Sequence, residues 1–255
     1  MASLFAPALA PFPPEELRAE RMAPPARPYL LGTDQFGRDS LSRLLHGGRV
    51  SFLVATISAI LSLLIGVTTG AFAGYRGGLV GDLIMRVMDV ILAFPYIILA
   101  IALAWLIGPS LTTVILVITV IGVPQFARLT RSAVVLLKEL PFVEASRALG
   151  QVESKILFRH ILLNALGPVV VYASLVMGIA INVEAALSFL GFGIQPPTPS
   201  WGTLLSNGRR FVYSNAWLVV FPGLMISLSV IGFNLIGDGL RDRLDPRLRG
   251  QSGPS

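Results

Sequence analysis

The sequence predicts an all-α membrane protein with five spanning helices. Of its 255 residues, 54% are hydrophobic and only 13% are charged, whereas soluble globular domains average about 25% charged residues. Two stretches, 50–74 and 90–127, contain no charged residue over 25 and 38 positions. A chain of this composition cannot cover a surface that faces water, so we expect most of it to lie in a membrane.

Composition also excludes several other classes of site. The chain has no cysteine, which rules out disulfides, cysteine-ligated zinc and thiol catalysis. Its two histidines, His46 and His160, are far apart in sequence, whereas metal-binding histidines normally have further ligands at close spacing. The net charge of +6 comes from arginines beside apolar segments, where membrane topology explains it without nucleic acid.

The first 49 residues are expected to precede the membrane domain. Their apolar head is only about a dozen residues long and is broken by prolines, too short for a span of about 20, and it lacks the basic start of a signal peptide. We expect a loosely ordered arm, then an interfacial lead-in in which Asp39 or Ser40 caps a helix carrying Leu41, Leu44 and Leu45 on one face. The predicted divisions are 1–30 (arm), 31–49 (lead-in), 50–239 (membrane domain) and 240–255 (tail).

The apolar stretches predict the spans. Residues 50–74 form the first, and 75–89 make a short polar connection. As one helix, 90–127 would be about 57 Å long, nearly twice a hydrocarbon core of about 30 Å. Gly108-Pro109-Ser110 interrupts it, so we predict a hairpin of two spans. The fourth and fifth spans are expected at 166–190 and at 217–237.

The charge-rich stretch 141–166 is expected to be a docking element. Phe142, Ala145 and Leu149 recur at helical spacing and share one face. Ala145, Ser146 and Ala148 are small, so a partner surface can approach closely. Gly150 is expected to end this helix, and a second helical run carries Lys155 and Arg159 four residues apart.

The basic residues predict the orientation. Alternating spans place twelve of them, in 75–89, in 128–160 and after Asp238, on one side of the membrane, against Arg209 and Arg210 on the other. The N-terminal arm and lead-in hold six more, but long segments have less weight in the positive-inside rule. The docking element and the C-terminus are therefore predicted to be cytoplasmic.

Asn182 and Glu184 fall towards the far end of the fourth span. An acidic side chain within a membrane is costly and normally faces the bundle interior or water. Three interpretations remain open: Glu184 lies at the membrane interface, pairs with another helix for assembly, or takes part in substrate passage.

The sequence lacks the motifs of the common catalytic sites. It contains no G-x-x-x-x-G-K-[ST], and neither of its two lysines, Lys138 and Lys155, follows a glycine. H-E-x-x-H, G-x-S-x-G and S-x-x-K are also missing. We therefore expect no enzyme activity and no cofactor in this chain.

Three segments resemble one transporter family. Glu144-Ala145-Ser146, followed by three residues and Gly150, is similar to the EAA–x3–G signature of bacterial ABC importer permeases. LGTDxxGRD at 31–39 resembles the C-type subunits of dipeptide, oligopeptide and nickel permeases, as does the ending GDGLRDRLDPRLRG. The resemblance implies a type I ABC importer transmembrane domain. It implies a cytoplasmic coupling helix whose ATPase-docking residues are Phe142, Glu144, Ala145, Ser146, Ala148, Leu149 and Gly150.

The same resemblance implies function and partners. The chain would import short peptides, or nickel or another small solute, across a bacterial or archaeal cytoplasmic membrane by alternating access. Its implied partners are a second, different permease, two ATPase subunits that bind ATP and magnesium, and an extracytoplasmic solute-binding protein.

The sequence departs from the family pattern at two places. The family's loop usually ends in Leu-Pro, where this chain has Leu162-Leu163-Asn164. The subgroup usually begins with an extra helix, and only SLFAPALAP resembles its end. Either the chain starts late, or it works with five spans and an outside N-terminus.

Two other classes of function remain open. A secondary carrier or channel would show inverted repeats or several ionisable residues at mid-membrane depth, and the sequence shows neither. A membrane scaffold would need the docking loop but no passage. ATP-dependent uptake distinguishes all three classes, because a carrier needs no ATPase and a scaffold transports nothing.

Overall fold

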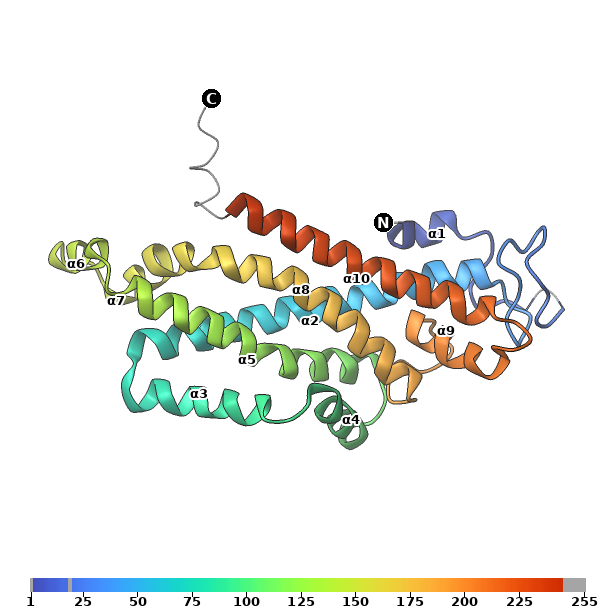
Figure 1. The fold of residues 1–255 in the computed structure, drawn as a ribbon, viewed down its shortest axis with the longest axis horizontal. Helices are drawn as coiled ribbons and strands as arrows, with labels where there is room; N and C mark the ends of the chain where they lie inside the picture. The colour runs from blue at the N-terminus through green and yellow to red at the C-terminus, as the bar shows by residue number, and fades with distance from the viewer. Residues whose placement is uncertain (1, 18–19, 245–255) are drawn as a thin grey trace, which may run out of the picture. The chain divides into compact units, whose positions relative to one another are not determined.

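The computed structural model describes residues 2–17 and 20–244, which form helices, turns and one isolated bridge between Thr33 and Asp39 (Figure 1). Most of the predicted tail, including Arg247 and Arg249, lies outside this range. The described residues form two compact units. Unit 1 takes them from 1–57, 97–118 and 178–232, and unit 2 from 58–96, 119–177 and 233–255.

Four helices in the described part of the chain are long and apolar enough to cross a membrane, or five spans result if one bent pair counts as a span. The long helices are α2 (Ser40–Arg76), α5 (Leu111–Leu137), α8 (Leu162–Phe189) and α10 (Trp217–Leu244). The bent pair is α3 (Gly78–Leu92) and α4 (Tyr96–Ile107), which meet at 90°. The α-helical membrane fold is thus confirmed.

The predicted lead-in helix and the predicted first span are not separate elements. Helix α2 begins at Ser40 rather than near Val50, because no residue between the lead-in and the span interrupts the helix. The predicted cap is confirmed, since the Asp39 carboxylate accepts a hydrogen bond from the Ser42 backbone N–H at 2.7 Å. Lead-in and span are therefore one helix.

The second and fifth spans also differ from prediction. Most of 75–89 is helical rather than a polar connection, and the chain breaks between α3 and α4 at 93–95. Pro95 explains this break, because proline disfavours helical geometry in the residue before it and has no N–H to donate. The predicted break at Gly108 is confirmed by a φ of +96° there. Helix α10 continues to Leu244 rather than ending near Gly237.

In unit 2, α2 and α5 are in contact at their backbones. Gly66, Gly70 and Gly74 are spaced four residues apart, so they share one face of α2. A Cβ atom added to Gly70 would lie 2.3 Å from the carbonyl oxygen of Ala127, and one added to Gly66 would lie 2.4 Å from the Phe126 Cβ. Small residues at this spacing let two membrane helices pack closely.

Helix α3 packs beside α5 in unit 2 (Figure 1). Met85 and Met88 contact α2 and α5, and two ion pairs join α3 to α5: Arg131 to Asp82 at 2.9 Å and Arg128 to Asp89 at 2.6 Å. Both pairs are partly exposed, so each contributes at most about 1 kcal/mol.

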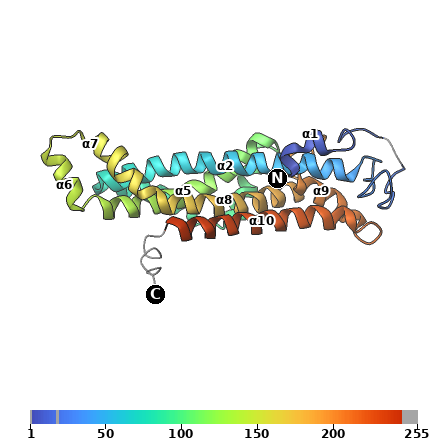
Figure 2. The ribbon, with the colours of Figure 1, turned by 90° about the horizontal axis from the view of Figure 1, so that it is seen from above.

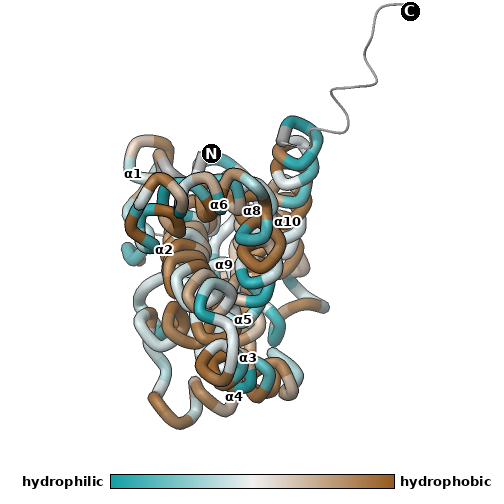
Figure 3. Tube along the Cα trace, turned by 90° about the vertical axis from the view of Figure 1, so that its left-hand side faces the viewer, coloured by the Kyte–Doolittle hydropathy of each residue, from teal (hydrophilic) through white to brown (hydrophobic). Residues whose placement is uncertain are grey.

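The opposite face of α3 is apolar and uncovered. Leu79, Leu83, Val87 and Val90 are all exposed, and hydrophobic residues predominate along α3 and α4 in Figure 3. The end of α10 is hydrophilic in the same view. An apolar face of this kind suits contact with lipid or with a neighbouring membrane subunit.

In unit 1, α9 (Trp201–Gly208) is held against α2 and α8. Ser200 and Thr203 form a capping box at its start. The Trp201 side chain is 1% exposed and donates its indole N–H to the Leu44 carbonyl at 2.9 Å. A short helical segment follows as η3 (Arg209–Phe211).

The N-terminal segment is not the loosely ordered arm that the sequence predicts. It begins with η1 (Ala2–Phe5) and α1 (Ala6–Leu9), and Ala6 is fully buried. The Phe12 N–H donates to the Ser42 hydroxyl at 3.1 Å, and Arg43 donates to the Pro14 carbonyl at 2.9 Å. These contacts attach the N-terminal segment to the start of α2, because the Ser42 hydroxyl and the Arg43 guanidinium form hydrogen bonds with backbone groups of that segment.

The α2–α5 contact predicts that replacing Gly70 with alanine lowers the stability of the protein, the reverse of the usual effect of this change within a helix. Alanine normally stabilises a helix by up to about 1 kcal/mol relative to glycine. Gly70→Ala should instead destabilise by about 1–3 kcal/mol, because its methyl group overlaps the α5 backbone. Thermal unfolding in detergent should show a lower midpoint for Gly70→Ala.

Gly239→Ala is the matched control, since Gly239 lies in α10 with nothing within 4 Å of an added Cβ. Its midpoint should stay equal to that of the wild type or rise. Equal midpoints for the two variants would contradict the close contact.

Candidate functional site

The predicted docking stretch forms a short helix, α6 (Pro141–Ala148), in unit 2. Leu140 has extended geometry before it, and Pro141 occupies the first helical turn, where a missing N–H costs nothing. Val143 is fully buried in a cluster with Ala71 of α2, Val134 of α5, and Ile156, Leu157 and Ile161. One inward side chain thus attaches α6 to three other helical segments.

The end of α6 is defined by Gly150. Its φ is +71°, a conformation that costs other residues about 1–2 kcal/mol. The Gly150 N–H donates to the Arg147 carbonyl at 2.9 Å, and the Gln151 N–H donates to the Ser146 carbonyl at 3.2 Å. This pair of bonds is the Schellman motif, so the predicted role of Gly150 as a helix terminator is confirmed.

The chain then turns into the next helical segment. Arg147 donates to Glu153 at 3.2 Å, and the His160 and Gln151 side chains are hydrogen-bonded at 3.0 Å. The segment contains α7 (Glu153–Lys155), a π-helical turn η2 (Ile156–Ile161) and α8, as one continuous helical stretch. The helix therefore runs through Leu162 and Asn164 without a break. The spacing of residues in the sequence did not predict the π-helical turn.

The seven predicted docking residues do not all face outward from α6. Ser146 turns inward, where it is 9% exposed and its hydroxyl donates to the Phe142 carbonyl at 2.8 Å. The other six are exposed: Phe142, Glu144, Ala145, Ala148, Leu149 and Gly150.

The outward surface of α6 is suited to contact with another protein. Figure 2 shows α6 lying beyond the ends of α5 and α7. Leu149 is 79% exposed and Val152, which sequence analysis did not select, is 68% exposed. Apolar side chains gathered on a protruding surface indicate an interaction site.

Glu184 lies in unit 1 and is fully buried. It accepts three hydrogen bonds from serine hydroxyls: Ser51 of α2 at 2.9 Å, Ser188 of α8 at 2.8 Å and Ser200, the cap of α9, at 2.7 Å. The carboxylate therefore joins three helices, and these contacts favour its role in assembly over the other interpretations.

Asn182 does not share this environment. It is exposed, so the structure separates two residues that the sequence grouped together. Of the three serines, only Ser188 could be found from spacing, because it lies four residues after Glu184 on the same helix. Ser51 and Ser200 come from elements distant in sequence, and only the fold brings them together.

Comparison with known proteins now identifies the family. The model of the binding-protein-dependent transport system inner membrane component matches residues 66–250. The chain belongs to this family.

Curated relatives and solved structures agree with this assignment. The dipeptide transport system permease protein DppC of Escherichia coli is 48% identical over 254 residues, with 97% of this chain and 85% of the relative covered. The glutathione transport system permease protein GsiD of Pectobacterium atrosepticum is 42% identical, with 88% and 75% covered. An inward-facing structure of the MetNI methionine ABC transporter matches the fold with a TM-score of 0.63 at 21% identity, with 80% and 97% covered.

These findings confirm the predicted ABC importer permease and its type I fold. The relatives are named as permease proteins, and the family places this chain in the inner membrane as a transport component. The secondary carrier, the channel and the scaffold are therefore not supported.

The three hydroxyl contacts predict a structural role for Glu184 within this permease. Glu184→Ala removes the shared acceptor of three buried hydroxyls, so we expect a loss of about 2–4 kcal/mol. Glu184→Gln keeps the shape and part of the hydrogen bonding and should lose less. Thermal unfolding in detergent, measured together with uptake by the assembled transporter, tests this.

Asn182→Ala, on the same helix but exposed, should leave the midpoint within about 1 °C of the wild type, as surface substitutions generally do. A Glu184→Gln variant with an unchanged midpoint but no uptake would instead assign Glu184 to the substrate pathway.

Proposed function

We propose that this chain is the membrane subunit of an ATP-driven importer of short peptides. The observation that carries the proposal is α6. Val143 anchors its inner side, and the apolar side chains of Phe142 in its first turn and of Leu149 and Val152 just after its end are exposed. The family supplies the class of transporter. The relatives named for dipeptides and for glutathione, itself a tripeptide, support the class of substrate.

The exposed face of α6 docks on a cytoplasmic ATPase subunit. When two such subunits bind ATP and magnesium and close, they displace α6. Val143 transmits this displacement to α2, α5 and η2, whose side chains surround it. Because ATP-bound and ATP-free ATPases favour different positions of α6, they bias the permease between outward-open and inward-open states.

The orientation follows from the basic residues. Arg128, Arg131 and Lys138 lie in α5 or just after it, ahead of α6, and such residues accumulate on the cytoplasmic side. Helix α6 and the C-terminus therefore face the cytoplasm. A solute-binding protein delivers the substrate from the other side, and a second, related permease completes the pathway.

Short peptides are preferred over nickel as the substrate. Both curated relatives described above are named for peptides or for glutathione.

Docking through α6 predicts that Glu144→Lys and Gly150→Val weaken capture of the ATPase subunits. Glu144→Lys reverses a charge on the exposed face, and Gly150→Val strains the turn that ends α6. Each should reduce the ATPase recovered with the purified permease at least about tenfold, equivalent to 1.4 kcal/mol. Co-purification from membranes measures this, and it also tests the orientation because the ATPases are cytoplasmic.

Two control variants separate docking from folding. Glu139→Lys makes the same charge change at an exposed position just before α6 and should retain the ATPase. Gly150→Asn should be milder than Gly150→Val, because asparagine tolerates positive φ. If Glu144→Lys and Gly150→Val both retain the ATPase as the wild type does, α6 is not the coupling helix.

Peptide import is tested with the complete transporter in proteoliposomes. A radiolabelled dipeptide should accumulate only with ATP, magnesium and the solute-binding protein present, and Glu144→Lys should abolish most of the accumulation. Uptake without the ATPase would indicate a carrier. Accumulation of nickel but not of dipeptide would overturn the substrate assignment.

A further inference from the structure

Unit 1 contains a cavity of about 680 Å³ that the proposed coupling mechanism does not use. Its walls come from the N-terminal segment, the loop before α2, the start of α2, the loop before α9, and α9 with η3. Sites for small molecules usually measure about 300–1,000 Å³. The cavity is therefore large enough for a ligand of a few residues.

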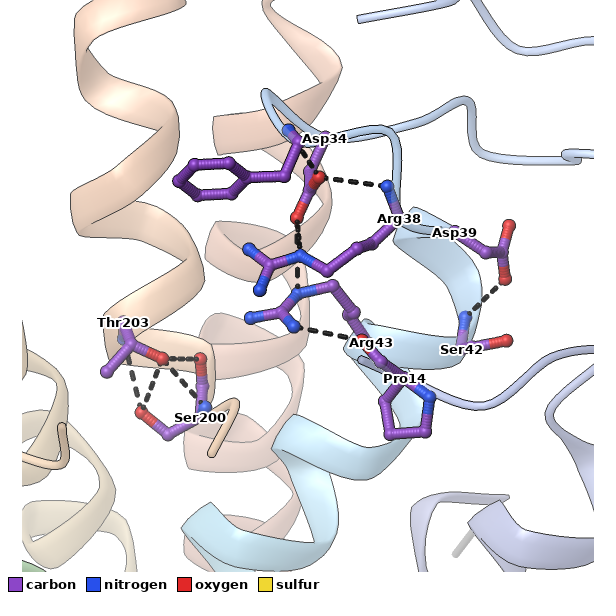
Figure 4. A network of polar contacts seen from close by, with 9 residues as sticks. Pro14, Asp34, Arg38, Asp39, Ser42, Arg43, Ser200 and Thr203 are labelled. Atoms are coloured by element: carbon purple, nitrogen blue, oxygen red, sulfur yellow. Dashed lines mark hydrogen bonds and ion pairs between the residues drawn. The ribbon is translucent and has the colours of Figure 1, made fainter. Parts of the chain in front are cut away.

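Four arginines line this cavity: Arg38, Arg43, Arg209 and Arg210. Arg38 and Arg43 are positioned by the Asp34 carboxylate, at 2.7 and 3.4 Å from their Nε atoms. Figure 4 shows that both guanidinium groups point towards the side on which Ser200 and Thr203 lie. Asp34 thus arranges two cations and neutralises only one of them.

Arg43 is the most confined of the four. It is 3% exposed, and its Nε has no hydrogen-bond partner among the described residues. One of its terminal nitrogens donates to the Pro14 carbonyl. The Arg43 charge is paired with the Asp34 carboxylate, but its Nε–H makes no hydrogen bond, and a buried donor without a hydrogen bond costs free energy.

Arg209 and Arg210 complete the cationic wall. The Arg209 guanidinium lies over the Phe189 ring at 4.9 Å, and Arg210 is exposed, with no ion pair within the described part of the chain. Arginine forks match the two oxygens of a carboxylate.

The cavity also contains one acid. Glu15 lines it and supplies a negative charge for an ammonium group. Thr198, Ser206 and Asn207 add neutral polar groups, while Pro196 and Phe211 add apolar surface. Glu15 comes from the N-terminal segment, whereas Arg209 and Arg210 come from η3, so different elements supply the two signs of charge. A lining that carries both signs matches a zwitterion better than a simple anion.

We propose that this cavity binds a short peptide through both of its charged ends. The arginines receive the free C-terminal carboxylate, and Glu15 receives the N-terminal ammonium group. This inference deepens the proposed function and rests on it for the class of ligand. The predicted topology places Arg209 and Arg210 on the extracytoplasmic side, where the peptide arrives.

Binding of Ala-Ala to the full-length permease in phosphatidylcholine nanodiscs tests this by isothermal titration. Ala-Ala amide lacks the carboxylate and should bind at least about tenfold more weakly to the wild type. Arg210→Gln should reduce this difference to about threefold or less. Arg49→Gln, at an exposed arginine of α2 outside the cavity, should preserve it.

The other end of the peptide has its own test. N-acetyl-Ala-Ala lacks the ammonium group and should bind more weakly to the wild type, whereas Glu15→Gln should bind both forms equally. Equal binding of Ala-Ala and its amide by the wild type would overturn the proposal. So would equal effects of Arg210→Gln and Arg49→Gln.

Two further measurements separate peptide binding from lipid binding, and failure of the cavity proposal from failure of the proposed transport function. If phosphatidylglycerol in the nanodiscs abolishes the Arg210-dependent binding, the cationic wall belongs to a lipid headgroup and the proposal fails. ATP-dependent uptake by the complete transporter is measured in parallel. Uptake without carboxylate-dependent binding refutes the cavity alone, whereas binding without uptake supports the cavity and refutes the proposed transport function.

Discussion

The backbone contact between α2 and α5 is the constraint on which the position of α6 depends. Gly70 lets the two helices meet at Ala127, and Ala71 and Val134 lie close to this contact along the same helices. These two residues form part of the cluster that receives Val143. A larger side chain at Gly70 would separate the helices and widen the cluster. The position of α6 therefore depends on glycine at position 70 of α2, where a larger side chain would not fit.

Unit 1 is held together in a different way. Its helices meet around polar groups: the Glu184 carboxylate with three serine hydroxyls, and Asp34 with two arginines. Buried polar groups of this kind demand specific partners, because an unsatisfied one costs free energy. They therefore fix which helices meet, while close backbone packing in unit 2 fixes how near two helices can come.

The same distinction bears on function. In the coupling that we propose, α6 acts through the buried Val143 on its inner side and through the exposed Leu149 and Val152 just after its end. The described lining of the unit 1 cavity instead contains four arginines and one acid, Glu15, which suits recognition of charge. The proposed coupling and the proposed recognition of peptide thus rest on different physical interactions in one chain.

The sequence by itself determined the class of the protein, the apolar segments, the break at Gly108 and the turn at Gly150. These features depend on local properties: hydropathy, glycine's access to positive φ, and helical spacing. The sequence also carried the motifs around Glu144 and Asp34 that indicate the family. The four-residue spacing of Gly66, Gly70 and Gly74 was visible in it too, although what they contact was not.

Only the tertiary structure decided which side chains those local elements bring together. It showed that the Pro95 break bends the second span, that Ser146 faces inward, and that Asn182 and Glu184 lie in different environments. It also attached the N-terminal segment to α2 and assembled Ser51, Ser188 and Ser200 around Glu184. The physical reason is that hydrogen bonds and packing contacts depend on distance in space, and residues 133 positions apart, such as Ser51 and Glu184, have no local pattern that reveals their proximity.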